Sequence, residues 1–142
     1  MTLKSLKPNI NTLYYLAAFA LPFLILFFAL LSEDISFNSD TTILASDGFH
    51  QYVIFAENLR NILHGSDSIF YTFTSGLGLN FYALISYYLG SFFSPFVYFF
   101  SLKSMPDAIY IFTLLKVACM GVSCFYSLRQ LYPKVLKPFS II

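Results

Sequence analysis

The chain has 142 residues, of which 58% are apolar and 11% are charged, and its formal net charge is +1. Soluble domains carry about 25% charged residues, so this composition excludes a soluble globular protein and indicates an integral membrane protein. No basic tract is present that would neutralise nucleic-acid phosphates, so no nucleic-acid partner is expected. Cys119 and Cys124 have the spacing of neither a metal site nor a redox motif, so no metal ligands are predicted.

The first predicted transmembrane helix covers residues 13–31, which include no charged residue. At about 1.5 Å per residue this stretch nearly spans the ~30 Å hydrocarbon core. Lys4 and Lys7 precede it and acidic residues follow it, so residues 1–12 are expected in the cytoplasm and the next loop outside. A cleaved signal peptide is the alternative. An uncleaved span is favoured because the stretch exceeds a 7–15-residue h-region and no Ala-x-Ala-like site follows.

The extracytoplasmic loop is expected over residues 32–80, and residues 33–67 hold six of the seven acidic residues. Apolar residues recur at helical spacing from Phe49 to Leu63, which predicts an amphipathic helix over 48–64 in the membrane interface. Gly65 is expected to end this helix. Asp47 stands just before it and is expected to cap its amino terminus, which would hold the carboxylate in a fixed place.

Gly76-Leu77-Gly78 has the glycine spacing of a phosphate-binding loop, but no strand precedes it and no Lys follows. We therefore expect a close backbone turn that returns the chain to the membrane. A second transmembrane helix is predicted over residues 81–102, with Gly90 and Pro95 as points of kinking or breakage. One crossing is expected there, and a re-entrant segment is the alternative.

The third predicted transmembrane helix covers residues 107–128, with Ser104 as its cap. Lys116 lies near its middle, where a charged side chain serves either a function or a structural pairing. A polar link and the start of a further span are expected over 129–142. Three crossings would place Arg129 and the lysines after it outside, against the charge rule. Either later spans dominate the orientation or the second apolar stretch is re-entrant.

The fold class is therefore all-α, a polytopic membrane protein with about three transmembrane helices and an interfacial helix in an extracytoplasmic loop. Three spans make a poor self-contained bundle, so the chain is interpreted as the amino-terminal fragment of a larger protein. Its partners are the bilayer and the remaining transmembrane helices of the full-length protein. The fragment alone is expected to be inactive.

Several motifs together resemble the start of the YfhO-like bacterial membrane proteins, over roughly residues 10 to 135. They are Asp47 with Gln51-Tyr52, the stretch from Phe70 to Phe81, Tyr87 to Ser91 with Pro95, Leu114-Leu115-Lys116, and Gly121 with Phe125-Tyr126. The resemblance implies a GT-C class glycosyltransferase that takes sugar from a polyprenyl-phosphate carrier on the outer face of the membrane. In Gram-positive bacteria it implies a cell-envelope acceptor such as teichoic acid.

In that class an acidic residue of the first extracytoplasmic loop is the expected catalytic group, and Asp47 matches the pattern. A base must take the proton of the acceptor hydroxyl, and the departing phosphate needs positive charge or a divalent metal near it. The metal requirement, like any other cofactor, is left open. The residues interpreted as substrate-binding are His50, Gln51, Tyr52, Arg60 and Lys116, and His64 is a further candidate cation.

A non-catalytic membrane protein, such as a transporter segment or an envelope assembly scaffold, is the alternative function. It would explain the kinked spans and Lys116 without any role for Asp47. The rest of the reading frame would discriminate between the two. A dozen spans with a large extracytoplasmic part favour the transferase, and internal inverted repeats favour transport.

Overall fold

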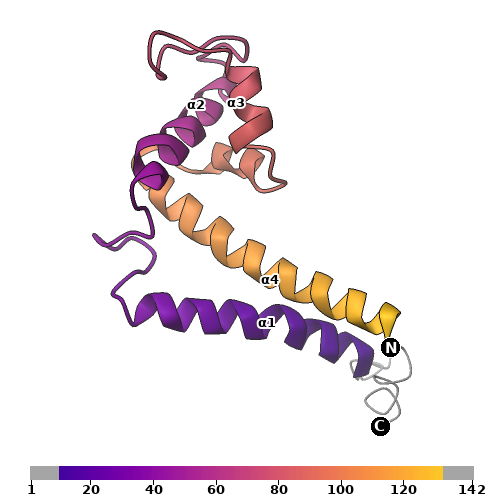
Figure 1. Ribbon diagram of the computed structural model, residues 1–142. Coiled ribbons are helices and arrows are strands. Elements are labelled where there is room, and N and C mark those ends of the chain that lie inside the picture. The colour runs from indigo at the N-terminus through magenta and orange to yellow at the C-terminus, as the bar shows by residue number, and fades with distance from the viewer. Residues whose placement is uncertain (1–9, 133–142) are drawn as a thin grey trace, which may run out of the picture. The chain divides into compact units, whose positions relative to one another are not determined.

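The computed structural model describes residues 10–132 (Figure 1). Residues 1–9 of the expected cytoplasmic terminus, and the expected start of a further span, lie outside this range. The described chain is helical, and its one β pairing is a bridge between Thr72 and Leu79, so the predicted all-α class is confirmed. The elements are α1 (Ile10–Leu31), the π-helix η1 (Gly48–Tyr52), α2 (Val53–Leu63), α3 (Phe81–Tyr88), the 3-10 helices η2 (Ser94–Phe99) and η3 (Leu102–Ser104), and α4 (Met105–Leu131).

The chain folds as two compact units, and each is described by itself. The helix-pair unit consists of α1 up to Ala29 and α4 from Thr113. The loop unit consists of Leu30 to Phe112 and contains the remaining helices with the first two turns of α4.

The two helices of the helix-pair unit pack antiparallel. Arg129 donates a hydrogen bond to the Asn11 side chain at 2.9 Å, and the ring of Phe125 meets that of Tyr15 edge-on at 5.1 Å between centroids. The two helices approach closely at Gly121, since a Cβ there would lie 2.3 Å from the carbonyl oxygen of Ala18. Successive contacts run forward along α1 and backward along α4. The start of α1 therefore lies beside the end of α4.

Two helices of the described chain are long and apolar enough to cross a membrane, Asn11–Leu31 and Leu102–Leu131. Their positions match the first and third predicted spans. The third is longer than expected, because α4 begins at Met105 and continues to Leu131, into the predicted polar link. Its start is capped differently too. Ser101 and Ser104 form a reciprocal capping box around η3, so Ser104 is not the cap of α4.

The predicted single transmembrane helix over 81–102 is wrong. Helix α3 ends at Tyr88, and the later part of the segment forms the short 3-10 helix η2. Glycine is a weak helix former, at about 1 kcal/mol less favourable than Ala, and proline lacks the N–H of the helical ladder. Gly90 follows the end of α3, and Pro95 lies in the first turn of η2, so neither residue is within an α-helix.

The core of the loop unit is formed by α2, α3, η2 and the head of α4, with Phe81, Met105 and Ala108 fully buried. The predicted helix over 48–64 is present as η1 followed by α2. Val53, Ala56 and Leu59 of its apolar face are buried, as the helical spacing indicated, whereas Phe49 and Tyr52 are exposed.

Helix α2 ends as predicted at Gly65, which has a φ of +79°. The Gly65 N–H donates to the Ile62 carbonyl at 2.9 Å, and the Ser66 N–H donates to the Asn61 carbonyl at 3.0 Å. These are the two hydrogen bonds of a Schellman motif. The motif requires a left-handed backbone at the residue that follows the helix cap, and glycine adopts this conformation most readily.

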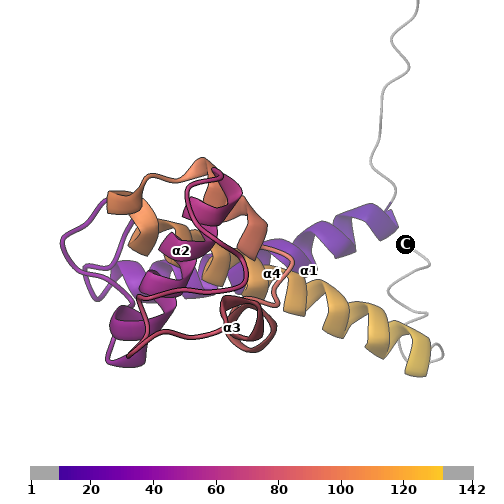
Figure 2. The same cartoon turned by 90° about the horizontal axis from the view of Figure 1, so that it is seen from above.

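The loop between α2 and α3 contains the expected close turn. The bridge of Thr72 with Leu79 closes it, and Gly78 has a φ of +112° beneath the ring of Tyr71. Asn58, buried on α2, donates to the Thr72 hydroxyl at 3.2 Å. This bond ties the turn to α2, and Figure 2 shows α2 and α3 with their connecting loop from above.

Candidate functional site

Asp47 lies at the first turn of η1, and its side chain does not cap the helix as predicted. A cap residue has an extended backbone, which lets its side chain reach the free N–H groups of the first turn. The backbone of Asp47 is already helical, with φ −59° and ψ −28°. The N–H of Gly48 donates to the Ala45 carbonyl, and those of Phe49 and His50 donate to the Ser46 carbonyl. These groups therefore need no side-chain cap.

The carboxylate of Asp47 is exposed and accepts a hydrogen bond from the Gln51 side chain at 3.2 Å. A π-helical turn closes between residues i and i+5, so residues four and five apart lie on the same side. Asp47, Gln51 and Tyr52 thus share one side of the turn. The Gln51 amide orients one carboxylate oxygen and leaves the exposed group accessible to a substrate.

Tyr52 connects this turn to α3. Its ring meets that of Tyr88 edge-on, with 5.4 Å between the centroids. Tyr88 also lines an open cleft of about 520 Å³, together with Leu79, Asn80, Ala83, Leu84 and Tyr87. This volume is within the range of about 300–1,000 Å³ for small-molecule sites. An uncharged, largely apolar surface therefore adjoins the turn that carries Asp47.

His50 lies in the same turn, with an exposed ring that packs edge-on against Phe49 at 6.0 Å. Arg60 lies elsewhere: it is 13 residues beyond Asp47 along the η1–α2 helical run, which corresponds to roughly 20 Å at helical rise. Its Nε donates to the carbonyl of Phe100. Arg60 therefore ties α2 to the segment before η3 and does not join Asp47.

His64 has a similar tethering role at the end of α2. Its Nε2 lies 3.1 Å from the carbonyl oxygen of Tyr98, and the two rings stack with 4.3 Å between centroids. Both contacts join residues that are 34 positions apart in the chain. Sequence reasoning offered no signal for these partners, because neither the arginine nor the histidine forms a motif with them.

Lys116 belongs to the helix-pair unit, where its side chain is exposed on α4 one turn after Thr113. It makes no ion pair within the part of the chain that the structure describes. A cation on an apolar helix of membrane-crossing length usually faces a cavity, a partner helix or the membrane surface.

Glu57 on α2 is an acidic group that sequence reasoning did not select. Its side chain is half-buried, and this burial raises the pKa of the Glu57 carboxyl above its ordinary value. The available signal was its position within an amphipathic helix, which does not distinguish it from a solvated carboxylate. Within residues 10–132, no three His, Cys, Asp or Glu side chains gather as metal ligands.

A family model described as bacterial membrane protein YfhO matches residues 17–142. No curated protein and no solved structure matches the chain.

Proposed function

The chain belongs to the YfhO family of bacterial membrane proteins, and we propose that it is the amino-terminal part of a membrane-embedded glycosyltransferase. The enzyme moves a sugar from a polyprenyl-phosphate donor to a cell-envelope acceptor such as teichoic acid. The observation that carries this proposal is the exposed Asp47 carboxylate, which is oriented by Gln51 on a turn adjoining the apolar cleft of α3.

The antiparallel helix pair supports an extracytoplasmic position for Asp47, which the proposed chemistry requires. The contact of Arg129 with Asn11 joins the start of α1 to the end of α4, which supports one side of the membrane for both. Lys4 and Lys7 precede α1 in the chain, and Arg129 lies at the end of α4, so the charge rule assigns this side to the cytoplasm. With two crossings in place of three, the conflict in the charge pattern disappears. The loop that contains Asp47 is then extracytoplasmic.

The lengths of the two long helices support two membrane crossings. Helix α1 has 22 residues and α4 has 27, roughly 33 and 40 Å at helical rise, which is enough to cross the ~30 Å hydrocarbon core. Lys116 lies near the middle of the Leu102–Leu131 span. A cation at such a position usually faces a bundle interior or a cavity, and a phosphate group is its proposed ligand.

The proposed reaction uses Asp47 as general base. Its carboxylate takes the proton of the acceptor hydroxyl as that oxygen bonds to the anomeric carbon of the donor sugar. The bond between the anomeric carbon and the phosphate oxygen breaks, and polyprenyl phosphate leaves with the electron pair. A general base contributes about 10²–10⁴-fold to such a step. His50 is on the same turn as Asp47 and is the candidate cation there, whereas the Arg60 side chain is bonded to the Phe100 carbonyl.

A non-catalytic role as a transporter segment is a second candidate, and the exposed Lys116 on a membrane-length helix favours it. The full-length protein in liposomes with a polyprenyl-phosphate sugar and teichoic acid tests both. The transferase produces glycosylated polymer and free polyprenyl phosphate in equal amounts. Passage of solute across the liposome membrane without glycosylated polymer would contradict the transferase and favour transport.

A further inference from the structure

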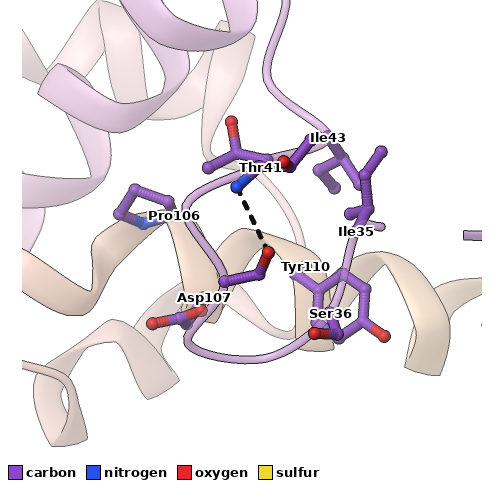
Figure 3. Close-up of a pocket in the computed structure, with 9 residues that line it drawn as sticks. Ile35, Ser36, Thr41, Ile43, Pro106, Asp107 and Tyr110 are labelled. Atoms are coloured by element: carbon purple, nitrogen blue, oxygen red, sulfur yellow. Dashed lines mark hydrogen bonds between the residues drawn. The ribbon is translucent and has the colours of Figure 1, made fainter. Parts of the chain in front are cut away.

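The segment 35–43, called the strap below, lies against the first turns of α4 within the loop unit (Figure 3). The carboxylate of Asp107 accepts a hydrogen bond from the backbone N–H of Asn38 at 2.8 Å, across 69 residues of sequence. The cavity that remains between strap and helix measures about 10 Å³, which is room for about one water molecule. Strap and helix are therefore in close contact, and the cavity is too small for a substrate.

Besides the partly buried side chains of Ile35 and Ile43, which border the cavity, the strap has few other anchors. Phe37 is 59% exposed, and the hydrogen bonds of Ser39, to the Thr41 N–H and to the Asp34 carbonyl, are local. Asp34 and Asn38 both have a φ of +58°, in the left-handed region that residues other than glycine adopt infrequently. A segment with little buried apolar surface and mostly local bonds opens easily. The Asp107–Asn38 bond is the long-range hydrogen bond that the structure gives for this strap.

The strap leads directly into the turn that carries Asp47. Leu44, the next residue, packs against the core of the loop unit, and a Cβ on Gly48 would lie 3.4 Å from its Cδ2 atom. The N–H of Gly48 donates to the carbonyl of Ala45 at 2.9 Å. A shift of the strap would therefore displace the start of η1 and with it the carboxylate.

We propose that Asp107 is a positioning residue, which fixes the strap through the Asn38 N–H and thereby holds Asp47 in its reactive place. This inference rests on the proposed function, since it assigns Asp47 as the base. Asp107 acts as a hydrogen-bond acceptor and not through its charge. An asparagine at this position retains an acceptor oxygen and should preserve the effect, whereas alanine should remove it.

The test uses the full-length protein with Asp107→Ala, Asp107→Asn and Tyr110→Phe, at matched membrane abundance. Tyr110 is the matched control, because it lines the same cavity and its buried hydroxyl has no protein partner within the described residues. Hydrogen exchange followed by mass spectrometry measures the opening of residues 35–43. Steady-state kinetics of sugar transfer measures kcat and the KM for the lipid donor.

In Asp107→Ala we expect the strap amides to exchange hydrogen roughly tenfold faster, because the strap has lost its long-range hydrogen bond. Its kcat should fall by about ten- to a hundredfold with KM little changed, the cost of displacing a catalytic group by about 1 Å. Asp107→Asn and Tyr110→Phe should resemble the parent protein in both measurements.

Unchanged exchange in Asp107→Ala would show that the bond does not hold the strap. Faster exchange with normal kcat would show that the strap does not position Asp47, and equal losses in Asp107→Asn and Asp107→Ala would assign the role to charge. Each result overturns the proposal. If Asp47→Asn keeps full activity, the proposed base is wrong, and the exchange result still stands by itself.

Discussion

Arg129 donates a hydrogen bond to the side chain of Asn11 at 2.9 Å, although 118 residues separate them. The same guanidinium lies 6.0 Å from the centroid of the Tyr15 ring. The two contacts join the last turns of α4 to the first turns of α1. The carboxyl-terminal end of α4 therefore lies beside the amino-terminal end of α1.

The first prediction concerns this topology. In full-length protein whose Cys119 and Cys124 are replaced by serine, a cysteine at Ser39 should react with an impermeant maleimide on intact cells. Cysteines at Ser5 and at Tyr132 should react only after the membrane is permeabilised, because both flank the cytoplasmic end of the helix pair. Labelling of a cysteine at position 132 on intact cells would contradict this topology and indicate an odd number of crossings.

The second prediction concerns the packing of the helix pair. Gly121→Ala places a Cβ 2.3 Å from the carbonyl oxygen of Ala18 and 2.6 Å from Cγ of Pro22. Overpacking of this kind costs about 1–3 kcal/mol, so the thermal unfolding midpoint in detergent should fall. Gly90→Ala is the control, since its Cβ would have ordinary contact at 3.5 Å. An equal or higher midpoint for Gly121→Ala would argue against the close approach.

The third prediction concerns Glu57, whose pKa is raised by burial. Where the folded pKa exceeds the unfolded one, the native state binds more protons, so stability falls as pH rises through that window. Below the unfolded pKa, near 4.5, the neutral carboxyl carries no such penalty. Glu57→Gln should therefore gain stability relative to the parent protein as pH rises above about 4.5.

Thermal unfolding of both proteins in detergent between pH 4 and pH 7 measures this difference. Glu33→Gln, at an exposed position in the loop unit, controls for the loss of one negative charge. A constant offset between Glu57→Gln and the parent across this range would show that burial of Glu57 does not affect stability.

The long helices and the amphipathic helix could be predicted because their signals are local. An uncharged apolar stretch identifies α1, and apolar spacing identifies α2 with Gly65 at its end. The second predicted span failed because apolar character alone does not show where a helix breaks. Gly90 and Pro95 divide an uncharged segment that is otherwise long enough to cross.

The candidate site was less predictable, because its geometry depends on nonlocal contacts. The helical backbone of Asp47 follows Ser46, which has a left-handed φ of +47° that no sequence motif indicated. Arg60 was selected for its charge, yet its partner Phe100 is 40 residues away. The bond between Asp107 and Asn38 joins residues that are 69 positions apart, so it could not be inferred from sequence spacing.

The central claim is that Asp47 is the catalytic base, and the most direct measurement compares Asp47→Asn with Asp40→Asn in full-length protein at matched membrane abundance. Asparagine keeps an oxygen that can accept the Gln51 hydrogen bond but cannot take a proton from the acceptor hydroxyl. The account predicts a loss of sugar transfer of at least about a hundredfold for Asp47→Asn, the lower limit for a general base. It predicts little change for Asp40→Asn. Near-normal transfer by Asp47→Asn would contradict the account.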